Sequence, residues 1–299
     1  MTTVQFGYTG AAATFTWPAG VTTCTIDITG SVSNPTSYYT SYALGGRVTG
    51  TLAKGAESTL QINCGGAPIN TSGGGASCAA GFNGGGTGFR ATSGPGFSQS
   101  ACGTGGGGAT DIRKGGTALS DRVAVAGGAG GSAMRLQDPD GDGNWWTFDA
   151  LGGGGGGGAY NNGVVGWFNR TNTGSNYVAT GGAGGGSGSG GAAGTGQTAG
   201  TAGTLGQGGN GPETTSSSYP YYMGGAGGGG YYGGGGGGSS NAFAQNNCAS
   251  GGGGGSAYTG GLTNAAGAAT YTSNTGVVNI TYTVPSGAVG TRSMMLGVG

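Results

Sequence analysis

Apolar and polar residues alternate with a period of two near both ends of the chain, which predicts β-strands there. On the N-terminal side the alternation covers residues 13–17, 21–28, 46–52 and 58–64. The most regular stretch, residues 276–284, lies near the other end and has no alternating neighbour. We therefore expect it to return to the N-terminal strands and complete one antiparallel β-sandwich from both ends of the chain.

Glycine dominates the residues between these ends. From 181 to 260, 34 of the 80 residues are glycine, and glycine runs such as Gly152–Gly158 and Gly251–Gly255 occur along the middle of the chain. One interpretation is a flexible linker. The other is a bundle of polyglycine II helices, which are extended, left-handed and have three residues per turn. Glycine helices can approach closely and exchange backbone hydrogen bonds, because they have no Cβ atoms. Large aromatic residues between the runs favour the bundle, since a spacer has no reason to carry them.

The predicted fold is thus an all-β sandwich beside a polyglycine II bundle with protruding loops. We assign the sandwich to residues 1–64 and 263–284, the glycine-rich bundle to 65–262, and a C-terminal tail to 285–299. We expect little or no α-helix, because each interior glycine costs a helix about 1 kcal/mol relative to alanine.

Composition narrows the class of protein further. Glycine accounts for 84 of 299 residues, and Leu, Ile, Val and Phe together for only 37, too few for one ordinary core of this length. Histidine is absent, which excludes catalysis by histidine and zinc ligation by histidine. Nine basic residues balance nine acidic ones, so we expect no nucleic-acid binding. No apolar stretch is long enough for a membrane span, and residues 1–10 do not resemble a signal peptide.

The five cysteines leave two redox states open. Their number is odd and no CxxC spacing occurs: Cys24, Cys64, Cys78, Cys102 and Cys248. They fit reduced, buried side chains, or a single disulfide drawn from Cys64, Cys78 and Cys102.

Aromatic residues cluster in polar segments between the glycine runs. If the runs stack side by side, these segments emerge as loops at the ends of the bundle, and aromatic loops on a rigid scaffold are typical of recognition surfaces. The residues that we predict to contact a receptor are Trp145, Trp146, Trp167, Phe168, Tyr221 and Tyr222. The alternative is that these aromatic residues cap the bundle or form a small core of their own.

Residues 138–149 carry alternating carboxylates in the pattern D-x-D-x-D-G, with a twelfth-position acid. The carboxylates of such a loop can converge on a calcium ion. The predicted ligands are Asp138, Asp140, Asp142, Asn144 and Asp149. Against this, aspartate is shorter than the usual glutamate at the twelfth position and no amphipathic helices flank the loop, so a solvated turn is the alternative.

Two further carboxylates are close in sequence to arginines, Asp111 to Arg113 and Asp121 to Arg122. A pair of acids can serve a hydrolase, but arginine–carboxylate pairs that fix the sandwich to the bundle are the simpler interpretation. No G-K-[ST] follows a glycine run, as a phosphate loop would require. The sequence predicts no enzymatic activity.

Several sequence blocks, and their order along the chain, resemble glycine-rich proteins of bacteria and of actinobacterial phages, where such proteins are minor tail proteins. The blocks span nearly the whole chain: 13–21, 45–49, 81–86, 105–113, 119–128, 205–209, 231–235 and 276–282. The architecture is similar to the glycine-rich region of the anaplastic lymphoma kinase ectodomain. This resemblance implies a β-sandwich combined with packed polyglycine helices.

The resemblance also implies a role. It suggests a phage virion protein of the tail tip or fibre, assembled in the host cytoplasm, that acts as a host-surface adhesin. The implied partners are other tail proteins, further copies of the chain, and a host glycan or receptor. The alternatives are a purely structural virion protein, such as a capsid decoration or tail spacer, and a bacterial surface adhesin.

Overall fold

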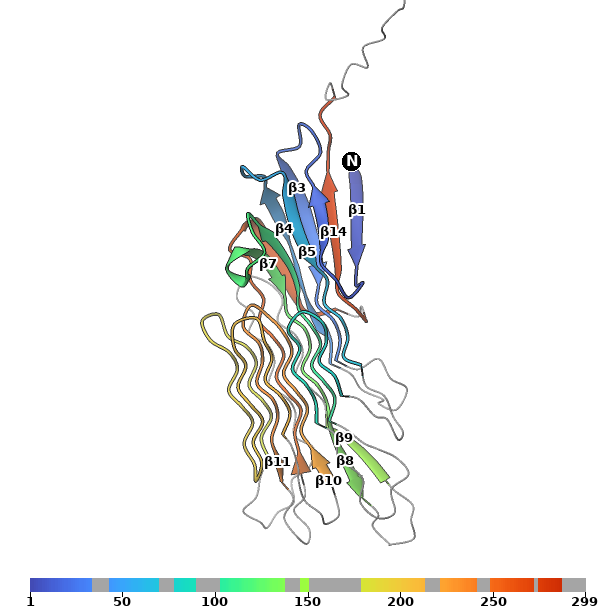
Figure 1. Ribbon diagram of the computed structural model, residues 1–299, viewed down its shortest axis with the longest axis vertical. Coiled ribbons are helices and arrows are strands. Elements are labelled where there is room, and N and C mark those ends of the chain that lie inside the picture. The colour runs from blue at the N-terminus through green and yellow to red at the C-terminus, as the bar shows by residue number, and fades with distance from the viewer. Residues whose placement is uncertain are drawn as a thin grey trace, which may run out of the picture.

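The protein is elongated, with a β-sandwich at one end and extended glycine-rich segments running side by side from it (Figure 1). The computed structural model describes residues 1–33, 43–69, 78–89, 103–137, 146–150, 179–212, 221–240, 248–271 and 274–286. Within these ranges the structure is mostly β, without α-helix; the one helical element is a 3₁₀ turn, η1 (Leu119–Asp121).

Two antiparallel sheets form the sandwich. The first has five strands in the order β1-β14-β3-β4-β13, and the second has four in the order β2-β5-β6-β7. The strands of the first sheet are β1 (Thr2–Gly7), β3 (Thr23–Thr29), β4 (Gly45–Ala53), β13 (Leu262–Tyr271) and β14 (Val277–Tyr282). Those of the second are β2 (Ala13–Thr16), β5 (Thr59–Asn63), β6 (Thr110–Lys114) and β7 (Arg122–Ala126).

The two ends of the chain meet in the first sheet, as the sequence predicts. β14 lies between β1 and β3, with Ile280 opposite Val4 on one side and Ile26 on the other. Its alternation places Val278 and Ile280 in the core and leaves Asn279 half-buried between polar neighbours. The period of two in the sequence therefore fixed which face of β14 is buried.

The predicted strands at 13–17 and 21–28 are both present, but they belong to different sheets. β2 pairs with β5, and β3 pairs with β14 and β4. The segment from Pro18 to Gly20 crosses between the sheets: Val21 N–H donates to the Pro18 carbonyl (3.2 Å), and Gly20 has a positive φ of 75°. Glycine adopts that conformation without steric cost.

The sandwich also takes strands from the middle of the chain. The interval 65–262, assigned to the glycine-rich part, supplies β6 and β7 to the second sheet, where Ile112 is opposite Ile62. β1 was not predicted as a strand either. β6 and β7 were missed because each is five residues long, is followed directly by glycine and lies in the interval assigned to the glycine-rich part.

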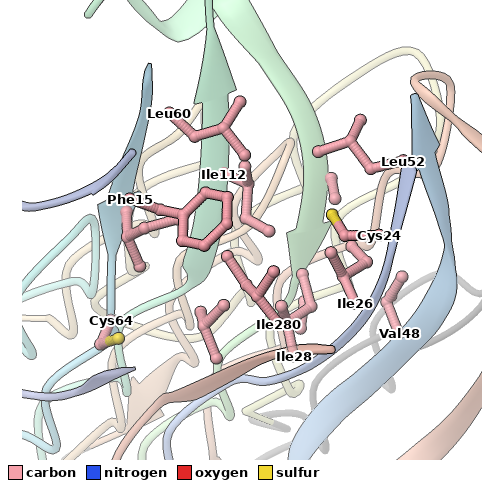
Figure 2. Packing of buried hydrophobic residues seen from close by; sticks show 14 of the residues in the cluster. Phe15, Cys24, Ile26, Ile28, Val48, Leu52, Leu60, Cys64, Ile112 and Ile280 are labelled. Atoms are coloured by element: carbon pink, nitrogen blue, oxygen red, sulfur yellow. The ribbon is translucent and has the colours of Figure 1, made fainter. Parts of the chain in front are cut away.

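One apolar cluster fills the space between the sheets (Figure 2). Ile26 and Ile28 from the first sheet pack with Leu60, Ile62 and Ile112 from the second, and all five are at most 1% exposed. Burial of each such side chain contributes about 1.5–3 kcal/mol. The 37 large aliphatic and phenylalanine residues are thus sufficient for a sandwich, although not for a core along the whole chain.

The glycine-rich segments are held together by backbone hydrogen bonds that repeat every three residues. Along 224–231, every third N–H donates to the same neighbouring segment, and successive residues donate to different neighbours. With N···O distances of 2.7–3.1 Å, the pairs are Gly225–Ser250, Gly228–Gly253 and Tyr231–Ser256; Ala226–Thr104 and Gly229–Gly107; and Gly227–Gly209. This segment is packed and hydrogen-bonded on several sides, as a flexible linker would not be.

The cysteines take both of the states left open by the sequence. Cys24 and Cys64 are free thiols in the sandwich, 3% and 4% exposed, whereas Cys78 is joined in a disulfide. Cys64, named above as a disulfide candidate, instead donates a weak hydrogen bond to the Phe6 carbonyl (3.5 Å).

We expect these two thiols to make folding weaker at high pH. Burial raises the pKa of Cys24 and that of Cys64 from 9.0 to about 11. The unfolded chain therefore ionises first, and the stability that is complete below pH 9 is lost progressively up to about pH 11. Denaturant unfolding across this range should show a steeper decline for the native protein than for a Cys24→Ala/Cys64→Ala variant. Equal slopes would contradict the assignment.

Candidate functional site

A small three-stranded sheet lies at the end of the molecule opposite the sandwich (Figure 1). It consists of β8 (Ala133–Gln137), β9 (Trp146–Ala150) and β10 (Tyr221–Met223), in the order β10-β8-β9. Two further short strands, β11 (Ser239–Ser240) and β12 (Cys248–Ala249), pair with each other, and β12 lies near β8. All the described residues that were predicted to contact a receptor lie in the three-stranded sheet, which we call the distal sheet.

The sheet brings together aromatic positions that are about 75 residues apart in the sequence. β8 is the central strand, and Arg135 is opposite Phe148 of β9 on one side and Tyr222 of β10 on the other. Trp146 is opposite Gln137, and Tyr221 is opposite Leu136. Three of the six predicted contact residues, Trp146, Tyr221 and Tyr222, therefore lie in one sheet. Trp145, Trp167 and Phe168 lie outside the described residues.

The predicted calcium ligands fall mostly outside the described ranges as well: Asp138, Asp140, Asp142 and Asn144. Asp149 is in β9, opposite Met134. It lies three residue pairs along the ladder from the Gln137–Trp146 pair, or about 10 Å at the usual rise per residue. Among the described side chains, no group of three or more acidic or cysteine residues could hold a metal. Calcium binding by this stretch stays a prediction.

The distal sheet continues directly from the packed glycine segments. Thr104 and Ser132 anchor the start of β8 through a pair of hydrogen bonds, from Thr104 N–H to the Ser132 carbonyl (2.8 Å) and from Ser132 N–H to Thr104 Oγ1 (2.6 Å). Met223, at the end of β10, is fully buried. β8 and β10 are thus attached to the bundle directly, and β9 is attached through its pairing with β8.

At the other end of the bundle, a buried carboxylate joins the sandwich to the glycine-rich part. Asp111 of β6 is 1% exposed and accepts hydrogen bonds from Asn63 Nδ2 (2.8 Å), Asn83 Nδ2 (3.0 Å), Arg113 Nε (2.9 Å) and Arg113 Nη2 (3.1 Å). The predicted Asp111–Arg113 pair is therefore confirmed. Each carboxylate oxygen has two donors, which offsets the cost of burying the charge.

Asn83 is the member of this network that the sequence did not reveal. It belongs to the glycine-rich segment 81–86 and has a positive φ of 65°, a conformation that asparagine adopts more readily than most residues. Its Nδ2 also donates to the Ala109 carbonyl (2.8 Å), and its own carbonyl accepts from Ala109 N–H (3.0 Å). The sequence feature that could have indicated this role is the asparagine within Gly81-Phe-Asn-Gly.

The second predicted ion pair, between Asp121 and Arg122, is wrong. Among the described residues Asp121 forms no ion pair, and its Oδ2 accepts from Ala118 N–H (2.8 Å). Arg122 is 4% exposed and donates to the carbonyls of Leu119 (2.9 Å), Gly230 (2.8 Å) and Tyr231 (3.0 Å). Asp121 is the last residue of η1, and its carboxylate turns back to the Ala118 N–H at the start of that turn, whereas Arg122 begins β7 and reaches the bundle.

Arg122 connects β7 to the glycine-rich part through aromatic contacts too. Its guanidinium carbon lies 4.7 Å from the centre of the Tyr231 ring, which stacks on Tyr258 with centroids 4.1 Å apart. Burial lowers the pKa of Arg122, but its fork remains matched to carbonyls on both sides of the junction. The orientation of the bundle on the sandwich is thus fixed by charged and aromatic residues.

Comparisons with known proteins assign no family. No protein-family model matches the chain, and no curated protein sequence matches it. In the part of the chain that the structure describes, no helix has the length and apolar character needed to cross a bilayer.

Proposed function

We propose that the protein is a virion component of the phage tail tip or fibre and attaches the particle to a host-surface glycan or receptor. The observation that supports this most is the position of the aromatic strands. β9 and β10 pair with the two edges of β8 at the end farthest from the sandwich (Figure 1), and β8 continues from a bundle held by lateral hydrogen bonds. Recognition residues are commonly displayed on such rigid scaffolds.

We infer that the glycine-rich segments are polyglycine II helices. Their hydrogen bonds return to the same neighbour every third residue, which is the period of that helix. The contact positions are glycines because a Cβ atom there would overlap a neighbouring carbonyl, as at Gly225 against Gly131 and Gly228 against Gly128. A bundle of this kind is a stiff spacer between an anchoring domain, the sandwich, and a display end, the distal sheet of β8, β9 and β10.

The proposal gives the sandwich an anchoring role and assigns no catalytic role to the chain. Aromatic side chains stack on sugar rings at little entropic cost, since each has few rotatable bonds. The proposed contact set remains Trp145, Trp146, Trp167, Phe168, Tyr221 and Tyr222. Other tail proteins and further copies of the chain are the proposed partners in the virion.

Alanine substitution of the proposed contact residues should reduce adsorption without unfolding the protein. We expect Trp167→Ala and Tyr221→Ala each to weaken saturable binding of the purified protein to host cells by at least tenfold, the loss of about 1.4 kcal/mol. Tyr8→Ala is the matched control, because Tyr8 is an exposed aromatic residue at the sandwich. Unchanged binding for both variants would remove the receptor role from these loops.

Immunogold labelling of intact particles separates the alternatives. Label at the distal tail together with cell binding is the expected result. Label on the head or along the tail shaft, without cell binding, would favour a purely structural virion protein. Absence of label from particles, with cell binding retained, would favour a bacterial surface adhesin.

A further inference from the structure

Edge strands expose unpaired backbone groups, and proteins protect such edges with bulges, charges, proline or covering segments. In the first sheet of the sandwich, the edge strand β13 is protected. Its pairing with β4 shifts register twice, after Thr263 and after Ala268, and Asn264 has a positive φ of 50°. A further strand could not form a regular ladder along this edge.

Both edges of the second sheet are short or covered. β7 is covered at Val125, which exchanges two backbone hydrogen bonds with Tyr258 (2.8 and 3.0 Å). β2 is only four residues long and is followed at once by Trp17 and Pro18. Neither edge offers a regular ladder of useful length.

The outer edge of β1 is different, because none of these protections is present in the part of the chain that the structure describes. The six residues Thr2–Gly7 pair with β14 without a register shift and include neither proline nor a charged side chain. Beyond β14, the main-chain groups of β1 have one further partner among the described residues, the Cys64 thiol at the Phe6 carbonyl (3.5 Å). β1 therefore presents a regular, uncharged and open strand edge.

We infer that β1 pairs with β1 of a second copy of this chain, antiparallel and about a two-fold axis. Val4 and Phe6 are half-buried, and Phe6 packs against the core, whereas Thr3 and Gln5 are exposed. Residues opposite each other share a face of a sheet. Within β1, two registers keep the apolar positions on the core side and place Val4 opposite an apolar residue: Val4 opposite Val4 with Thr3 opposite Gln5, or Val4 opposite Phe6 with Gln5 opposite Gln5.

A second copy fits this edge because β1 is complementary to itself. In either register Val4 meets an apolar partner, exposed polar residues meet each other, and no like charges are opposed. The two-fold arrangement uses up both β1 edges, and the remaining edges of the sandwich are protected, so assembly ends at a dimer.

The geometry also sets the shape of this dimer. β1 runs along the long axis of the molecule toward the glycine-rich part (Figure 1). Antiparallel pairing therefore directs the two glycine-rich parts away from each other, and the dimer is longer than one chain. The inference does not depend on the adhesin proposal, because it is tested on the purified protein alone.

Lysines on the open edge should weaken the dimer. In a Thr3→Lys/Gln5→Lys variant, both registers place like charges opposite each other, and we expect the dimer dissociation constant from sedimentation equilibrium to rise about tenfold or more. Mixing this variant with Thr3→Glu/Gln5→Glu should restore dimers as mixed pairs. The mixture also controls for folding, because misfolded chains would not recover.

The matched control is Thr23→Lys/Thr25→Lys, two exposed positions on the same face of the central strand β3. It should dimerise like the native chain, and small-angle scattering should show an elongated dimer. A native chain that stays monomeric at its highest soluble concentration would overturn the inference. So would a dimer that both lysine variants leave equally strong.

Discussion

Replacing Gly234 with alanine is expected to lower the free energy of unfolding by about 3 kcal/mol or more. Gly234 donates to the Gly228 carbonyl (2.9 Å) and accepts from Gly209 N–H (2.8 Å). A Cβ atom there would lie well inside 3.0 Å of the Gly253 carbonyl, a backbone group that cannot rotate aside. One methyl group must therefore separate segments that several hydrogen bonds hold together. Chemical denaturation of the two proteins measures the loss.

Gly188→Ala is the matched control for this substitution. No atom lies within 4 Å of a Cβ atom built at Gly188, and the residue is exposed. Where the backbone permits it, Gly→Ala stabilises by about 0.4–1 kcal/mol, because the unfolded chain loses freedom. Similar stability of the two variants would show that the close approach at Gly234 is not needed for folding.

Removal of the buried carboxylate at the junction is the second large effect that we expect. Asp111→Ala removes the carboxylate that pairs with the Arg113 guanidinium, which is 11% exposed, and that also accepts from two asparagine amides. Breaking one side of a buried pair costs about 3–5 kcal/mol. That is a large part of the 5–15 kcal/mol by which domains are usually stable. Thermal and denaturant unfolding should both show it.

The control for charge removal is Asp27→Ala, on the outer face of the first sheet. Asp27 makes a two-bonded pair with Arg47 at 2.8 Å, much like that of Asp111, but its side chain is 32% exposed and that of Arg47 is 40% exposed. Water replaces the lost partner there, so we expect a loss of about 1 kcal/mol or less. Equal losses for Asp111→Ala and Asp27→Ala would contradict the role of burial.

The two substitutions test the packing of the bundle and its connection to the sandwich, respectively. Gly234 lies within the bundle, and Asp111 lies where the sandwich meets it. If the distal sheet is a display end, its position relative to the anchor depends on these contacts, and host binding should weaken in variants that fold but have a loosened junction.

The sequence predicted the sandwich best where its own pattern was regular. The alternation at 276–284 identified β14 and its return to the N-terminal strands, because burial on one face imposes a period of two. β6 and β7 escaped notice because each has only five residues, too few for a clear periodicity, and is followed directly by glycine. Their strand character comes from pairing with β5 and with each other.

The candidate site was predictable in composition but not in arrangement. Trp146, Tyr221 and Tyr222 stood out as aromatic residues in polar segments, but nothing in the sequence indicated that β8 would lie between them. Arg135, at the centre of that sheet, was not singled out for the same reason. Which strands pair in a sheet depends on the path of the chain through the whole fold, and local residue types do not specify that path.

The sequence by itself determined the local features of this protein: alternating strands at both ends, glycine runs that permit close backbone approach, and aromatic segments between them. The tertiary structure alone decided which groups meet. Asp121 and Arg122 are neighbours in sequence yet serve different partners, whereas Asn63, Asn83 and Asp111 are far apart and share one buried charge. A residue's chemistry is local, but the burial that gives an interaction its strength depends on the whole fold.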